Sequence, residues 1–125
     1  MKSLKRKTAS TMTSDMKQHQ ISEEKDDCTC ELKPFSAGNV SILSIPVCHC
    51  TDSLGCLVTL DGDWRIAFSG DRTITDNFTE IAGSCDLLIH EASFTDDLIS
   101  TAREKRHSTI GQALETGKAM NAKYI

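Results

Sequence analysis

The chain has 125 residues, of which 38% are hydrophobic, 26% are charged and 5% are aromatic. This length favours one small domain. No apolar run approaches the roughly 20 residues that span a bilayer, and no apolar segment follows the basic N-terminus, so we expect neither a membrane-spanning protein nor a secretory signal. The net charge of −4, from 14 basic and 18 acidic residues, excludes a strongly basic nucleic-acid coat but not a local RNA site.

Residues 1–38 differ in composition from the rest of the chain. A basic cluster at 2–7 is followed by a Ser/Thr/Gln stretch and then by acidic residues at 23–27, with few large apolar side chains. This composition indicates a disordered or poorly packed leader, and residues 39–125 are then the folded part. The basic cluster is compatible with a targeting signal, although a solvated tail is the simpler interpretation.

The six cysteines include two closely spaced pairs, Cys28 with Cys30 and Cys48 with Cys50. One residue separates the members of each pair, whereas zinc ribbons favour two to four. A structural zinc site built from cysteines is therefore the minor alternative. We favour reduced thiols that pack as small apolar side chains.

From residue 39 onwards the pattern is that of a mixed α/β domain. Strands are predicted at 40–47, 56–60, 64–68 and 86–89, and the second and third form a hairpin. A helix is predicted over 96–106, with acidic residues in its first turn and basic residues in its last. Thr109 and Gln112 match a capping box, which starts a second helix. Residues 122–125 begin a strand-like run, so we expect a fragment of a longer protein.

Several metal-binding or acid–base side chains stand where these elements end. His49 follows the first predicted strand, Asp71 follows the third, His90 follows the fourth, and His107 lies between the two helices. Loops at strand ends gather functional side chains in layered α/β folds. Imidazole and carboxylate together suit zinc, manganese or acid–base catalysis. Each residue alone also has an ordinary interpretation, as a hydrogen-bonded structural histidine or a Gly-Asp turn.

Three short strings resemble the motifs of one family in order and spacing: Ser69-Gly70-Asp71, His90-Glu91-Ala92-Ser93 and His107-Ser108-Thr109. The family is ribonuclease Z, the tRNA 3′-processing endonuclease of the metallo-β-lactamase superfamily, which reads S-G-D-T, H-E-A-T and H-S-T. The segment around His49 is similar to the stretch at the family's third motif. The run over residues 45–125 looks most like the C-terminal half of the long, eukaryotic form.

This resemblance implies a four-layer αββα sandwich with two zinc ions at one edge of the sheets, of which this chain would form the C-terminal half. His49 matches a zinc-binding histidine, and Asp71 matches the aspartate that bridges the two ions. Glu91 and His107 match residues that support catalysis through a charge relay to an active-site aspartate. The remaining motif residues are expected to support the site: His90, Ser108 and Thr109.

The implied activity is zinc-dependent removal of 3′ trailers from precursor tRNA, with a nuclear or mitochondrial location and neither DNA nor membrane as a partner. The sequence also departs from the family. The HxHxDH motif that supplies most zinc ligands is absent, as is the histidine expected after Ile125, and Arg72 replaces the usual threonine. We therefore expect an incomplete fragment that is inactive alone.

A second interpretation is a non-catalytic RNA- or protein-binding remnant of the same fold, which zinc content and RNA cleavage would separate from an enzyme. A phosphodiesterase of the superfamily that acts on small molecules is disfavoured, because the motifs at His90 and His107 occur together. Half of a sandwich should also leave one sheet face uncovered, and exposed apolar sheet faces and edges invite association.

Overall fold

The structure, a computed structural model, describes residues 32–125. The elements in chain order are β1 (Phe35–Ala37), β2 (Val40–Pro46), β3 (Leu54–Leu60), β4 (Trp64–Phe68), α1 (Asp76–Ala82), β5 (Leu87–Ile89), the 3₁₀ turn η1 (Asp96–Leu98), α2 (Ile99–Glu104) and α3 (Ile110–Ala119). Residues 1–31, most of the predicted leader, lie outside the described residues. Among the described helices, none is long and apolar enough to cross a bilayer.

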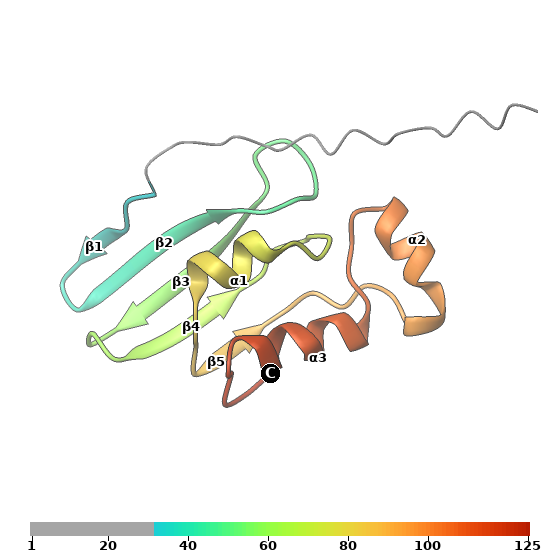
Figure 1. The fold of residues 1–125 in the computed structure, drawn as a ribbon. Coiled ribbons are helices and arrows are strands. Elements are labelled where there is room, and N and C mark those ends of the chain that lie inside the picture. Colours follow the sequence, from blue (N-terminus) through green and yellow to red (C-terminus); the bar gives the residue numbers. More distant parts are fainter. Residues whose placement is uncertain (1–31) are drawn as a thin grey trace, which may run out of the picture.

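The five strands form one sheet in the order β1-β2-β3-β4-β5 (Figure 1). The first four strands pair antiparallel, and α1 then carries the chain across to β5, which pairs parallel to β4. The predicted mixed α/β class is confirmed, and the four predicted strands agree with β2 to β5 within two residues.

Two elements differ from the sequence-based expectation. β1 lies inside the range assigned to the leader, where Phe35 pairs with Ile42 of β2. α1 was not predicted at all. It has seven residues, of which only Phe78 and Ala82 are buried, so it offers too few apolar positions to reveal a helical period.

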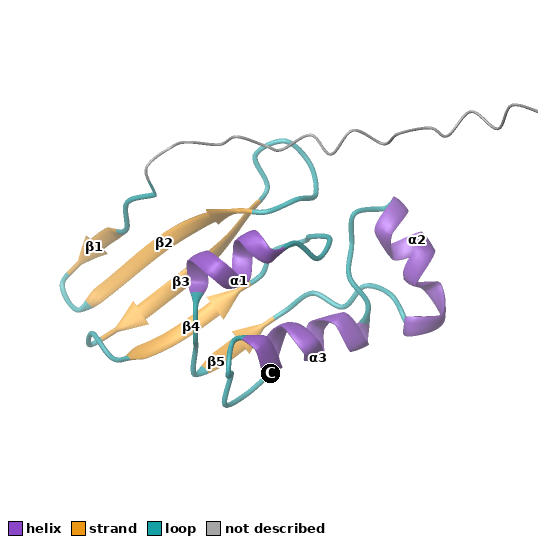
Figure 2. Ribbon diagram, in the orientation of Figure 1, coloured by secondary structure: helices purple, strands orange, loops and turns teal. Residues whose placement is uncertain are grey.

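One face of the sheet is covered by α1 and by the end of α3 (Figure 2). The buried apolar side chains between these layers come from the strands, the helices and their flanking residues: Ile45, Val47, Leu57, Ala67, Phe78, Ala82, Cys85, Leu88 and Met120. Each large side chain removed from water in this way contributes roughly 1.5–3 kcal/mol. This layer is the core that fixes the strand ends where the candidate site lies.

The opposite face of the sheet is apolar and partly exposed. The strand register places Ile42, Val58, Ile66 and Leu87 side by side across β2 to β5. Further large side chains stand on the same face, with exposed fractions of 53% for Trp64, 49% for Phe68 and 47% for Ile89. Within residues 32–125, no second layer covers this face. One uncovered sheet face is what half of an αββα sandwich is expected to show.

The C-terminal elements follow the sequence signals closely. The helix expected over 96–106 begins as η1 and continues as α2. The predicted capping box at the start of α3 is present, because the Thr109 hydroxyl accepts from Gln112 N and the Gln112 side chain accepts from Thr109 N. The strand-like run near the C-terminus lies beside β5, where Tyr124 forms a parallel bridge with Leu87.

Candidate metal centre

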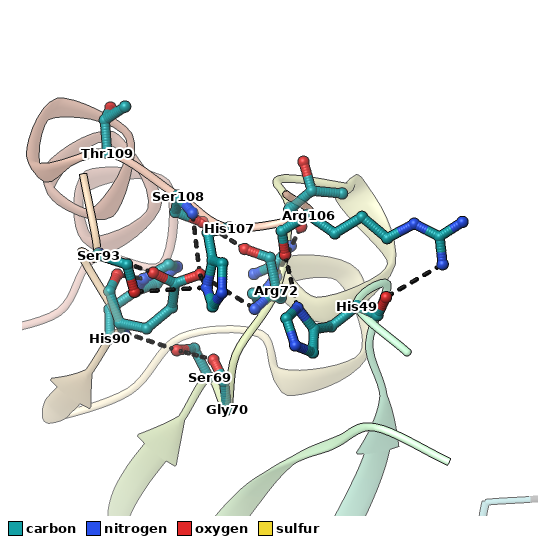
Figure 3. A network of polar contacts seen from close by, with 12 residues as sticks. His49, Ser69, Gly70, Arg72, His90, Ser93, Arg106, His107, Ser108 and Thr109 are labelled. Atoms are coloured by element: carbon teal, nitrogen blue, oxygen red, sulfur yellow. Dashed lines mark hydrogen bonds and ion pairs between the residues drawn. The ribbon is translucent and has the colours of Figure 1, made fainter. Parts of the chain in front are cut away.

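The predicted site residues converge at one edge of the sheet. β2 and β4 both run antiparallel to β3, and β5 runs parallel to β4, so the carboxyl ends of these three strands lie at the same edge. His49 follows β2, Asp71 follows β4 and Glu91 follows β5. The α2–α3 loop brings His107 to this edge, beside His49 (Figure 3).

Asp71 reaches this edge because β4 turns tightly at Gly70. Gly70 has a φ of +60°, and a Cβ there would lie 2.5 Å from the carbonyl oxygen of Leu54. Only glycine accepts both the left-handed backbone and that close approach. The Ser69 hydroxyl accepts a hydrogen bond from Glu91 N at 3.0 Å, which ties the end of β4 to the end of β5.

His49, Asp71 and His107 form a group that could hold a metal ion. One possible ligand atom of each lies within 4.8 Å of the others. The rings of His49 and His107 have centroids 4.6 Å apart. The structure thus joins the two residues predicted as ligands, His49 and Asp71, and adds His107, which the sequence analysis assigned to catalysis.

Both histidines of this group use Nδ1 for a contact outside it. His49 Nδ1 lies 2.9 Å from the carbonyl oxygen of Arg106, and His107 Nδ1 lies 3.2 Å from Glu91 Oε1. A carbonyl or an ionised carboxylate only accepts, so Nδ1 carries the hydrogen in each ring. Nε2 is then the ring nitrogen left for a metal or a substrate, an arrangement typical of metal-binding histidines.

The Glu91 carboxylate holds the loops of the site together. Oε1 accepts from Arg72 N at 3.1 Å and from Ser108 N at 2.9 Å, besides His107, and Oε2 accepts from Ser93 N at 3.0 Å. Burial raises the pKa of Glu91, but the hydrogen bonds from Ser93, Arg72 and His107 outweigh it and hold that pKa below its usual value. Glu91 is therefore a stable anion that fixes the His107 ring.

The three residues expected to support the site have different surroundings. Ser108 is fully buried, and its hydroxyl donates to the carbonyl oxygen of Arg72 at 2.6 Å. Thr109 caps α3. His90 contacts the carbonyl oxygen of Glu91 through Nδ1, and burial lowers the pKa of His90. His90 is not part of the metal-ligand group.

Arg72 is the most unexpected residue of the site. It is fully buried, and its guanidinium donates to the carbonyl oxygen of Thr75 at 2.6 Å and stacks on Phe78, 4.7 Å from the ring centre. Burial lowers its pKa to about 10. The sequence marked Arg72 only as a departure from the family motif, because no local signal predicts the burial of an arginine that follows a Gly-Asp turn.

No protein-family model matches the chain. Among curated proteins, it is 35% identical over 97 residues to zinc phosphodiesterase ELAC protein 2 of Mus musculus, and 38% identical over 86 residues to ribonuclease Z 1 of Schizosaccharomyces pombe. These matches cover 78% and 69% of this chain. The matched part of the chain is homologous to a part of ribonuclease Z. It spans 11% of the length of each of these two relatives.

Solved structures show the same fold over the matched part. Human tRNase Z, short form, has a TM-score of 0.64 and 30% identity, over 71% of this chain and 35% of that chain. YhfI from Bacillus subtilis, a metallo-β-lactamase fold protein, has a TM-score of 0.66 and 24% identity, over 73% of this chain and 37% of its own. The expected partial metallo-β-lactamase fold is confirmed.

Proposed function

We propose that this chain supplies part of the active site of a zinc-dependent endoribonuclease that removes 3′ trailers from precursor tRNA. The observation that carries the proposal is the joining of His49, Asp71 and the Glu91–His107 pair at one sheet edge, in a chain homologous to ribonuclease Z. The relatives that match are named as zinc phosphodiesterases and as ribonuclease Z. By the family resemblance, we also propose a nuclear or mitochondrial location.

The residues present fit a zinc ion. An imidazole and a carboxylate, from His49 and Asp71, are nitrogen and oxygen donors that zinc accepts, and His49 has Nδ1 engaged elsewhere. His107, the third residue of the group, is reserved for proton transfer in this proposal. His49 and Asp71 would hold the metal. When bound, zinc would polarise the scissile phosphate and lower the pKa of a bound water.

The Glu91–His107 pair supplies acid catalysis in this proposal. Glu91 accepts from His107 Nδ1, so a proton on His107 Nε2 can pass to the leaving 3′-oxygen of the tRNA. The anionic carboxylate stabilises the protonated ring before that transfer. Arg72 and Ser108 hold Glu91 in place through their backbone N–H groups, so they position the pair without touching the substrate.

The site in the described residues is incomplete for two metal ions. With His107 reserved for proton transfer, its group offers two ligand residues, His49 and Asp71, whereas one catalytic zinc already uses about three protein ligands and a water. We therefore propose that the 125-residue chain does not cleave RNA alone.

A second candidate function is RNA or protein binding without catalysis. It is favoured by the apolar face of the sheet, where Trp64, Phe68 and Ile89 are about half exposed.

A chimeric enzyme tests the proposal. The homologous segment of ribonuclease Z 1 from Schizosaccharomyces pombe is replaced by this chain's matching residues, and zinc content and cleavage of a 3′-extended precursor tRNA are measured. We expect cleavage. Asp71→Ala should abolish it and lower the zinc content, and His49→Ala should weaken zinc binding. Asp63→Ala, in an exposed turn, is the matched control.

The catalytic pair gives a different signature in the same chimera. Glu91→Ala and His107→Ala should each slow cleavage about 10–100-fold while the zinc content stays near that of the unmodified chimera. A folded chimera with full zinc and no cleavage would contradict the proposal and favour the binding remnant.

A further inference from the structure

The residue before His107 has an unusual backbone conformation. Arg106 has a φ of +57°, in the left-handed region. Side chains other than glycine, asparagine and aspartate rarely adopt this region, and it persists where the surroundings fix it. Here the left-handed residue ends α2. Arg106 N donates to the carbonyl oxygen of Arg103 at 3.1 Å and His107 N donates to that of Ala102 at 2.8 Å, which is the Schellman pattern of a helix C-terminus. The same turn sets the direction in which the Arg106 carbonyl points.

Arg106 and His49 are 57 positions apart, and two reciprocal hydrogen bonds join them (Figure 3). His49 Nδ1 donates to the carbonyl oxygen of Arg106 at 2.9 Å. Arg106 Nη1 donates to the carbonyl oxygen of His49 at 3.0 Å. The guanidinium belongs to an exposed side chain, whereas the carbonyl is part of the backbone and is aimed by the left-handed turn.

The carbonyl contact determines which nitrogen of His49 can act as a ligand. The hydrogen bond that one ring nitrogen makes sets which of the two is protonated. Because Nδ1 donates to Arg106, Nε2 is the nitrogen without hydrogen in the neutral ring, and it is left for the ligand group with Asp71 and His107. The same turn delivers His107, the next residue, to Glu91.

We propose that Arg106 is a positioning residue, whose left-handed backbone aims its carbonyl at His49 and thereby fixes the tautomer of that ring. It acts through its backbone conformation and not through the charge of its guanidinium. The importance of this contact for metal binding rests on the proposed role of His49 as a ligand, but the effect on the tautomer does not.

Substitutions at this position separate backbone from charge. Arg106→Gly and Arg106→Val both remove the guanidinium and keep the carbonyl. Glycine adopts a positive φ freely, whereas a β-branched valine strongly resists it. Arg106→Asn and Arg106→Ala complete a series, because tolerance of the left-handed region falls in the order Gly, Asn, Ala, Val. Arg103→Ala removes a nearby exposed arginine as the charge control.

The readout is nitrogen NMR of the His49 ring in the full chain without metal, assigned by loss of the signal in His49→Gln. We expect the Nδ1–H form in the wild type, Arg106→Gly, Arg106→Asn and Arg103→Ala. That form should decline through Arg106→Ala and Arg106→Val. The Gly, Asn and Ala variants keep the test informative if the valine variant does not fold.

Zinc affinity, measured by competition with a chromophoric chelator, should follow the same order. We expect Arg106→Gly to stay within a few-fold of the wild type and Arg106→Val to bind about 10–100-fold more weakly, as for other residues that orient a metal ligand. Equal losses in the Gly and Val variants, or an unchanged tautomer across the series, would overturn the inference. Unchanged zinc affinity in His49→Gln would instead refute the proposed ligand role of His49.

Discussion

The candidate metal centre and the open face of the sheet differ in how far this chain provides their contacts. Most polar side chains of the site have hydrogen-bond partners here, whereas the apolar side chains of the open face remain partly exposed to water. At the site, four hydrogen bonds converge on the Glu91 carboxylate, and both ligand-group histidines have Nδ1 engaged. On the open face, Trp64, Phe68 and Ile89 are about half exposed, and no second layer of described residues covers them. Most polar groups of the site have partners within these loops, with Arg72 Nη1 and His90 Nε2 as exceptions among the described residues, whereas the apolar surface lacks a covering layer.

This difference has a physical reason. The contacts of the site join loops that the sheet edge already holds close together, so the chain can orient these side chains itself. Covering an apolar sheet face takes a second layer of packed elements. This chain therefore orients the side chains of the candidate site itself, and the proposed catalytic site needs residues beyond its ligand group.

The largest expected effect is on the free energy of unfolding, and it should differ between the two faces of the sheet. Phe78→Ala, on the covered face, should lower the free energy of unfolding by about 3–5 kcal/mol, because it leaves a cavity in the core. Phe68→Ala, on the open face, should lower it by less than about 1 kcal/mol, since the ring is already half exposed to water. Urea unfolding at low protein concentration measures both. Equal losses would show that the open face is packed in solution.

The open face should also drive self-association. The double variant Phe68→Ser and Ile89→Ser should shift the chain toward monomers in sedimentation experiments, because it reduces the exposed apolar patch. Thr95→Ser, at an exposed position outside the sheet, is the control. A wild-type chain that stays monomeric and unfolds in one sharp thermal transition would contradict this prediction.

Loss of Glu91 should be the next largest effect. Glu91→Ala leaves the N–H groups of Arg72 and Ser108 without their acceptor, and both residues are fully buried. Each buried donor left unpaired costs about 1–3 kcal/mol. Glu115→Ala removes an exposed carboxylate whose one ion pair within residues 32–125 is with Lys118, and should change stability by less than about 0.5 kcal/mol. Similar unfolding free energies for the two variants would contradict the network described for Glu91.

A smaller effect is expected at the start of α3. Thr109→Ala removes one side of the capping box and should cost about 1 kcal/mol. Thr95 also precedes a helical turn, but its side chain makes no capping hydrogen bond, so Thr95→Ala should cost much less. Urea unfolding of the two variants compares them directly.

The smallest effect is a pH dependence. The pKa of Glu91 is held below its usual value in the folded chain, so its ionised form stabilises the fold. That contribution is complete above the pKa of the unfolded chain and is lost as the pH falls through the lower, folded pKa. Between pH 7 and pH 3, wild-type stability should therefore fall more steeply than that of Glu91→Gln. Parallel curves would show that Glu91 has the same pKa in both states.

Local signals predicted much of this structure. Loosely alternating apolar residues located β2, a short apolar run and the turn after it located β3 and β4, and the Thr109–Gln112 pair located the start of α3. The motif strings selected His49, Asp71, Glu91 and His107, which the fold brings to one sheet edge. These features were accessible because each depends on residues close in sequence or on a short string.

The remaining features depend on contacts between distant segments. β1 forms by pairing with β2, where Phe35 lies opposite Ile42. A strand of three residues is too short to show an alternating pattern, so the sequence did not predict it. The burial of Arg72 depends on α1, which provides Phe78. The left-handed conformation of Arg106 could not be predicted because the position holds no glycine. His49, which donates to the Arg106 carbonyl, is 57 positions away in the sequence.

The central claim is that this chain orients part of a ribonuclease Z site and needs further residues to complete it. Cleavage of a 3′-extended precursor tRNA by the purified 125-residue chain, with its zinc content measured on the same sample, tests this claim most directly. We expect no 3′ cleavage and fewer than two tightly bound zinc ions. Two tightly bound zinc ions with robust 3′ cleavage would contradict it.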